Sequence, residues 1–438
     1  MMHTELITLI LFVSLVLLLI SGLPLAFGMG GVAALIVLVL SGPQSLSILS
    51  SITYGVMDNF VLTAIPLFIF MGLVLERSGV ADDVFAMMYK WIGSIKGGLA
   101  IGTVIICTIF AACTGVSGAA TVTMGVIALP AMLRYNYHKS VAVGCISAGG
   151  ALGILIPPSV LMIVYGIFSG ESIGQLYAGG VFPGLLLAAL FIIYIAIRCY
   201  FQPHLGPPIP PEERATWRER ITSLRGVILP MALILIVLGT IFKGVCTATE
   251  AAAIGCAGSL LCAAIYRRLN WKLLTEACYE GLRLSCMVIW IIIGGSCFAS
   301  LYTYVGALEF IKGVVAVLPV SRYLVLAGMQ FTLFILGCLM DPGGILMITV
   351  PIFVPVIKML GFDAVWFGVL FIVNMEMAYL TPPFGFNLFY MKAIVPKTIT
   401  MMDIYKSIVP FVALQAIGLV ICILFPKIIL WLPQTLFR

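Results

Sequence analysis

VAVGCISAGGALGILIPPSVLMIVYG, at residues 141–166, is long and apolar enough to cross a lipid bilayer, yet it is interrupted near its middle. A helix of about 20 residues spans the hydrocarbon core. Pro157 and Pro158 have no N–H group and disfavour helix in the residues before them. Irregular backbone inside a membrane is stable only where protein or a water-filled cavity surrounds it. The segment predicts two half-helices joined by unwound backbone, with a single kinked helix as the simpler alternative.

A second apolar segment of the same kind lies at residues 364–392, AVWFGVLFIVNMEMAYLTPPFGFNLFYMK, and is broken at Pro382 and Pro383. The offset between the two proline pairs is 382 − 157 = 225 residues. The same offset relates Gly118 to Gly343, Pro130 to Pro355 and Tyr165 to Tyr390. Paired interrupted segments at corresponding positions are the best sequence pointer to a transporter binding site. We therefore predict two halves of similar construction.

The composition identifies the class of protein. Of 438 residues, 62% are hydrophobic and 9% are charged, whereas a soluble domain carries about 25% charged residues. The many apolar stretches of helical length predict an all-α polytopic membrane protein. The net charge of +6 comes from residues between the apolar stretches, so it does not indicate nucleic-acid binding.

No enzyme signature is present in the sequence. It contains no phosphate-binding glycine loop, no nucleophile elbow and no HExxH motif. The three histidines fall in predicted loops, and the twelve cysteines form no CxxC pair and lie almost all within apolar stretches. We expect the cysteines to pack as small apolar residues and the protein not to be an enzyme.

The order of apolar and polar stretches predicts five regions. Each half contains an amphipathic arm, a re-entrant helical hairpin and a broken transmembrane helix. The first hairpin turns at TGVSG, residues 114–118, and two ordinary spans with a tight turn are its alternative. The regions are N-terminal scaffold spans at 1–53; a first repeat at 54–198, with hairpin 99–135 and broken helix 141–168; a cytoplasmic connection at 199–226; scaffold spans and an arm at 227–283; and a second repeat at 284–438, with hairpin 323–360 and broken helix 364–392.

Basic residues indicate the orientation of this layout. If both hairpins return to the side that they entered, most of the 23 lysines and arginines fall on one side. The positive-inside rule makes this side the cytoplasm. The two repeats are then inverted relative to each other, and both chain ends are periplasmic. Residues 407–432 form the predicted last span.

The broken segments suggest how an anion could be held. Helix N-termini present free N–H groups and partial positive charge, and Pro158-Ser159 and Pro383-Phe384 would begin half-helices near the midplane. No lysine or arginine is near a predicted midplane, so bound cations would have to help hold an anion. The predicted substrate contacts are Ser117, Pro157, Pro158, Ser159, Asn374, Pro382, Pro383 and Asn387. For Asn374 and Asn387, hydrogen bonding between helices is the alternative.

Two acids lie deep in the predicted membrane region. Asp341 sits at the second hairpin tip, and Glu376 lies in the second broken segment. An intramembrane acid is a functional candidate by default. For Asp341 the alternative is a cap on the following helix, and for Glu376 it is a position beside an aqueous loop.

Nearly the whole chain resembles the large permease (DctM-type) subunit of tripartite ATP-independent periplasmic (TRAP) transporters. The resemblance is carried by SGAATVTMGVIALPAML and the first broken segment, by MDPGGILMITVPIFVPVIKMLGF and the second, and by GLPLAFGMG near the start. It implies an elevator-type fold of the ion-transporter superfamily and a sodium-driven importer in the bacterial inner membrane. It also implies a small four-helix membrane subunit and a periplasmic binding protein that delivers an organic acid.

The resemblance further implies at least two sodium sites, each between a hairpin tip and the adjacent broken helix. One would use Ser117, Gly118, Gly149, Gly150 and Gly153, and the other Asp341, Gly343, Thr381 and Gly385. The chain departs from the family pattern at residues 374–378, where NMEMA replaces small residues. A stand-alone cation/dicarboxylate carrier of the same superfamily is the alternative function, and a channel is a weaker one.

Overall fold

A computed structural model describes residues 2–115, 117–317, 319–383 and 385–437. Within these ranges every regular element is a helix, and eight helices are long and apolar enough to span a membrane. Val116, in the predicted first tip, and Phe384, predicted to begin a half-helix, lie outside the described residues. The prediction of an all-α polytopic membrane protein is confirmed.

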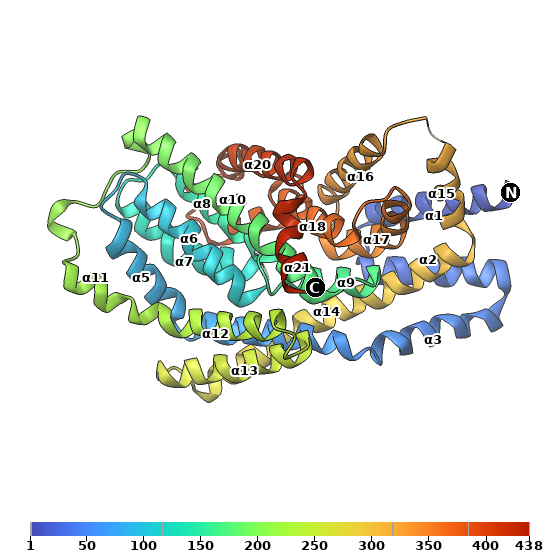
Figure 1. The fold of residues 1–438 in the computed structure, drawn as a ribbon, viewed down its shortest axis with the longest axis horizontal. Coiled ribbons are helices and arrows are strands. Elements are labelled where there is room, and N and C mark those ends of the chain that lie inside the picture. The colour runs from blue at the N-terminus through green and yellow to red at the C-terminus, as the bar shows by residue number, and fades with distance from the viewer. Residues whose placement is uncertain (1, 116, 318, 384, 438) are drawn as a thin grey trace.

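One set of helices lies along one long side of the molecule (Figure 1). α4 packs against α13 and α14, and α14 also packs against α2 and α3. We call this set the scaffold. Its members are α2 (Leu25–Ser41), α3 (Leu46–Met57), α4 (Ala64–Arg77), α12 (Arg225–Phe242), α13 (Ala248–Ile265) and α14 (Trp271–Tyr304), with α1 (Met2–Ser21) packed on α2.

Most of the remaining helices follow the same order twice. An arm is followed by two mutually packed helices, two half-helices and a long helix. In the first half these are α5 (Val80–Ile92), α6 (Gly98–Thr114), α7 (Ser117–Arg134), α8 (Lys139–Ala151), α9 (Val160–Ser169) and α10 (Ile173–Phe201). In the second half they are α15 (Ala307–Val317), α16 (Arg322–Gly337), α17 (Pro342–Met359), α18 (Ala364–Leu380), α19 (Phe386–Ile394) and α20 (Met401–Leu424).

The two halves interlock. α7 packs against α19, and in the corresponding way α17 packs against α9. α20 packs against α8, and α10 packs against α18. The Tyr165 hydroxyl on α9 donates to the Ala364 carbonyl at the start of α18, at 2.8 Å. Each half-helix is therefore enclosed partly by the other half of the chain.

The structure differs from the predicted elements in two places. The predicted arm before residue 284 is not separate, because α14 runs without a break from Trp271 to Tyr304. No proline interrupts this stretch, so its helical hydrogen bonds continue. The last predicted span, 407–432, is two helices: α20 ends at Leu424 and α21 begins at Lys427. Pro426 lies at the break and α21 packs back on α10.

The connection at 199–226 is ordered. It contains 3-10 turns at Pro203–Leu205 and Pro211–Glu213 and the short helix α11 (Trp217–Ser223). Backbone hydrogen bonds from Ile209 N to Gly93 O, at 2.9 Å, and from Gly97 N to Gly206 O, at 2.8 Å, attach it to the segment between α5 and α6. The connection is therefore packed against the rest of the protein and is not a free linker.

The scaffold depends on close helix contacts that glycine permits. A Cβ added to Gly294 of α14 would collide with the carbonyl group of Ala26 on α2. It would also lie 3.1 Å from the Cα atom of Ala26. Gly239 in the interior of α12 has open space around it.

We predict that Gly294→Ala lowers the free energy of unfolding by about 1–3 kcal/mol, the usual cost of overpacking. Gly239→Ala is the matched control and should be neutral or stabilising, because alanine favours helix by about 1 kcal/mol. Thermal unfolding of the detergent-solubilised protein measures both, and equal stabilities would contradict the close contact.

Candidate functional site

The first hairpin tip lies directly on the first broken helix. Gly115 adopts a left-handed conformation, with φ +63°, and a Cβ there would collide with the Pro158 carbonyl oxygen. The positive φ and the close approach both require glycine. The tip therefore covers the first proline pair, and Pro157 and Pro158 are buried.

Ser159 closes the start of α9. It is fully buried in an extended conformation, and its hydroxyl accepts a hydrogen bond from Met162 N at 3.4 Å and donates to the Ile154 carbonyl. The Tyr177 hydroxyl on α10 donates to the Ser159 carbonyl at 3.4 Å. In this conformation the predicted anion-binding start of α9 is enclosed and its polar groups are engaged by protein.

The predicted glycines of α8 fit the two arms of the first hairpin. A Cβ on Gly149 would be 2.9 Å from Cys107 Cβ on α6, and one on Gly150 would be 3.0 Å from Thr121 Cα on α7. At the end of α8, Leu152 N donates to the carbonyl groups of Gly149 and Gly150. Gly153 follows in the 3-10 turn Leu152–Ile154. The close packing brings the first hairpin and the first break together.

The second break is arranged differently. Pro382 and Pro383 are exposed, and Thr381 is half-buried. The Thr381 hydroxyl donates to Met377 O at 2.7 Å, and its carbonyl accepts from Gly385 N at 3.1 Å. This break is therefore open where the first is covered.

Asp341 caps α17. Its Oδ2 accepts a hydrogen bond from Gly343 N at 2.8 Å, and the residue is half-buried at the second tip. It also lies within electrostatic range of the hydroxyl groups of Tyr379 and Tyr390. The cap is confirmed.

The two asparagines link helices. Asn374 Nδ2 donates to the carbonyl and to Oε1 of Gln330 on α16, at 2.8 and 2.7 Å. Asn387 Nδ2 donates to the Ser147 carbonyl on α8 at 3.3 Å. Asn374 and Asn387 are both buried. In this structure they form hydrogen bonds between helices, which was the alternative to substrate binding.

Two tyrosines that the sequence interpretation missed lie between the tips. The side chains of Ser117 and Tyr379 lie close enough to interact. A Cβ on Gly118 would be 2.8 Å from the ring of Tyr390. Tyr379 thus connects the first tip to the end of α18, beside Asp341. The sequence signal available was the position of Tyr379 just before the second proline pair and the 225-residue offset of Tyr390 from Tyr165.

A cavity of about 200 Å³ opens beside the first tip. It is bounded by the hairpin, Tyr390 and the scaffold helices α4 and α14, and its lining includes Thr114, Gly118, Glu76 and Glu280. Glu76 accepts from the Thr123 hydroxyl at 2.8 Å, and Arg77 pairs with Glu276 and Glu280. Among the described residues the lining has acidic side chains and no basic one.

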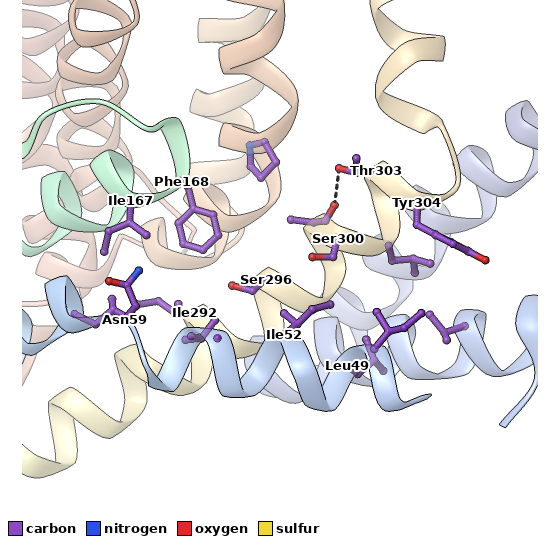
Figure 2. Close-up of a pocket in the computed structure, with 18 of the residues that line it drawn as sticks. Leu49, Ile52, Asn59, Ile167, Phe168, Ile292, Ser296, Ser300, Thr303 and Tyr304 are labelled. Carbon is purple, nitrogen blue, oxygen red and sulfur yellow. Dashed lines mark hydrogen bonds between the residues drawn. The ribbon is translucent and has the colours of Figure 1, made fainter. Parts of the chain in front are cut away.

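A larger cavity, of about 670 Å³, lies away from both tips (Figure 2). Residues of α3, α14 and α9 surround it, and it contains none of the predicted site residues. Ser296, Ser300 and Thr303 supply hydroxyl groups from α14, and the Thr303 hydroxyl donates to the Ala299 carbonyl at 3.1 Å. Ile167 and Phe168 of α9 face the scaffold across it (Figure 2).

Residues 12–428 match the family model described as "Tripartite ATP-independent periplasmic transporter, DctM component". The chain belongs to the DctM family. It is 34% identical to the C4-dicarboxylate TRAP transporter large permease protein DctM of Pseudomonas aeruginosa, over 93% of this chain and 94% of that one. It is 32% identical to the ectoine large permease TeaC of Halomonas elongata, over 86% and 87%, and 27% identical to the sialic acid large permease SiaM of Vibrio cholerae, over 95% and 96%.

A solved structure has a similar fold. The YdaH transporter of Alcanivorax borkumensis superposes with a TM-score of 0.63 at 14% identity, over 94% of this chain and 99% of that one. The expected relation to DctM-type permeases is confirmed, and the relatives are permease subunits rather than enzymes.

The Ser117–Tyr379 contact gives a direct test of the site. We predict that Tyr379→Phe lowers the rate of uptake about fivefold, because it removes the hydroxyl that lies near Ser117 and Asp341, and a polar interaction of this kind contributes about 1 kcal/mol. Its thermal stability should change little. Tyr279→Phe on α14, where the side chain is exposed, is the matched control and should transport normally. Unchanged uptake by Tyr379→Phe would show that the contact does not matter for transport.

Proposed function

We propose that this DctM-family chain is the large subunit of a sodium-coupled secondary transporter that imports an organic acid anion, a carboxylate or a sulfonate. The binding protein of the system would deliver the anion from the periplasm, and a separate small four-helix membrane subunit would complete the permease. The chain would lie in the inner membrane with both ends periplasmic.

The observation that carries this proposal is the convergence of both hairpin tips on the second break. Ser117 of the first tip and Asp341 of the second tip both lie near the hydroxyl group of Tyr379. The neighbouring cavity has carboxylates and no basic lining residue among those described. An anion entering such a site needs cations beside it, and oxygen ligands suit Na⁺. This supports coupling of anion uptake to sodium.

For the sodium ions, two groups of residues are proposed as ligands. Ser117 and Gly118 at the first tip, with Gly149, Gly150 and Gly153 of the first break, would form one site. Asp341 and Gly343 at the second tip, with Thr381 and Gly385, would form the other. The fit is best in the second group, because Asp341, at the start of α17, is the one carboxylate in either group. Pro382 and Pro383, which directly follow Thr381 of this group, are exposed and would leave a route for ions and substrate.

An elevator movement is the proposed mechanism. The interlocked helices of the two halves would move as one body against the scaffold. Support comes from the packing of α7 on α19 and of α17 on α9, which ties the half-helices together. The cavity of about 670 Å³ between α9 and the scaffold provides space at that boundary. The repeated order of elements supports the inverted repeats.

The relatives' names support the substrate class and the partners. They include transporters for C4-dicarboxylates, ectoine, isethionate and sialic acid. The isethionate relative is called DctMQ, and this chain aligns with only 65% of it. We take the remainder to correspond to the small subunit, which in the present system would be a separate polypeptide.

Reconstitution tests the function. The chain and its small subunit would be placed in liposomes with the binding protein outside, and uptake of labelled organic anions would be measured. We predict uptake only when the binding protein and an inward sodium gradient are both present. A potassium gradient of equal size is the control. Sodium-driven uptake without the binding protein would favour the stand-alone carrier instead.

A pair of variants tests the second sodium site. Asp341 and Asp363 both cap helices, through Gly343 N and Trp366 N, and asparagine caps as well as aspartate. We predict that Asp341→Asn raises the sodium concentration for half-maximal uptake by about tenfold, a loss of about 1.4 kcal/mol in binding. Asp363→Asn should leave it unchanged. An equal response of the two variants would remove Asp341 from the site.

A further inference from the structure

Glu376 is a fully buried acid without a partner. It lies on α18 with 0% of its surface exposed. Neither Oε1 nor Oε2 has a hydrogen-bond partner among the described residues. Every residue of α18 except Tyr379 is buried. The carboxyl group is therefore enclosed in the middle of the interlocked helices.

The ionisable groups on the helices around α18 bind partners other than Glu376. On α8, α9 and α10, Cys145, Tyr165 and Tyr177 donate to the carbonyls of Ala142, Ala364 and Ser159. Arg198 on α10 donates to the Tyr194 hydroxyl. On α16, Arg322 lies over the rings of Tyr323 and Phe362, and Gln330 is bound by Asn374.

The charged groups of α17, α19 and α20 are also engaged or exposed. Asp341 accepts from Gly343 N, and Lys358 pairs with Glu171. Lys392 donates to Ile399 O and Asp403 pairs with Lys139, while Lys406 is exposed. No cation of these helices is therefore in contact with Glu376, and the described residues contain no cluster of three or more potential metal-binding acids, cysteines or histidines.

A second unpartnered polar side chain lies on the helix that packs against α18. The indole N–H of Trp366 donates to the Cys422 carbonyl at 3.2 Å, so this face of α20 is turned toward α18. Gln415 is seven residues before Cys422, which is about two helical turns and the same face. It is fully buried, and both its amide atoms lack partners. The α18–α20 interface thus has unused hydrogen-bonding capacity.

An isolated ionised carboxylate in such surroundings is strongly unfavourable, and the group takes up a proton instead. We propose that Glu376 is a proton-binding site, which carries its proton in this conformation and releases it during the transport cycle, so that a proton is imported with the substrate. This coupling rests on the proposed transport function and adds a proton to the sodium ions. Thr381 is only five residues further along, about 8 Å at 1.5 Å per residue, and the exposed proline pair follows it. Movement at this break can therefore bring water to the carboxyl.

Infrared spectroscopy tests the proton directly and needs neither substrate nor binding protein. The protein in lipid at neutral pH should show the carbonyl band of a protonated carboxylic acid. Glu376→Gln should remove it while the unfolding temperature is kept, because the amide has nearly the same size. Glu309→Gln, at an exposed glutamate paired with Lys312, should leave the band unchanged. The proposal is overturned if the band is absent, if it survives in Glu376→Gln, or if sodium alone removes it at constant pH.

Transport in the reconstituted system tests the coupling. With one proton per substrate, accumulation by the wild type should change about tenfold for each unit of imposed pH difference, since one unit is about 1.4 kcal/mol. Glu376→Gln should lose this dependence and keep its response to sodium. Accumulation that ignores the pH difference in the wild type would overturn the coupling. Failure of all uptake would count against the proposed function, while the infrared result would still decide the proton site.

Discussion

The structure depends on satisfying backbone and side-chain polar groups where two helices are broken inside an apolar protein. Helix breaks leave N–H and C=O groups without their regular partners, and lipid offers none. At the first break Ser159 bonds to Met162 N and Ile154 O, and the tip at Gly115 closes over Pro158. At the second, Thr381 bonds to Met377 O and Gly385 N. The first hairpin covers the first break, and the second break meets this need with its own Thr381 hydrogen bonds.

The same need explains why the halves interlock. A half-helix is too short to be enclosed by its own neighbours in sequence, so α9 packs against α17 and α19 against α7. Asn387 of one half donates to the Ser147 carbonyl of the other. The two breaks are therefore linked through packed helices, as the proposed alternating-access movement would require.

The two breaks are chemically different despite their shared PP motif. The first is buried and its serine is fully engaged, whereas the second exposes its prolines and adjoins Tyr379, Tyr390 and Asp341. This asymmetry directs the search for bound ions and substrate to the second break in this conformation. It also places Glu376, which is buried close before that break, where a proton could be gained or lost.

The sequence by itself determined the membrane class and the paired broken segments, because hydropathy, proline and glycine act locally along the chain. It predicted the hairpins, and it offered the cap at Asp341 as an alternative to a functional role. It did not determine that α14 is continuous, that Asn374 binds Gln330, that Tyr379 meets Ser117, or that one break is covered and the other open. Apart from the continuity of α14, those features join residues from about 40 to more than 250 positions apart. Only tertiary packing decides which distant side chains meet, because the free energy of a buried polar group depends on the partner that folding brings to it.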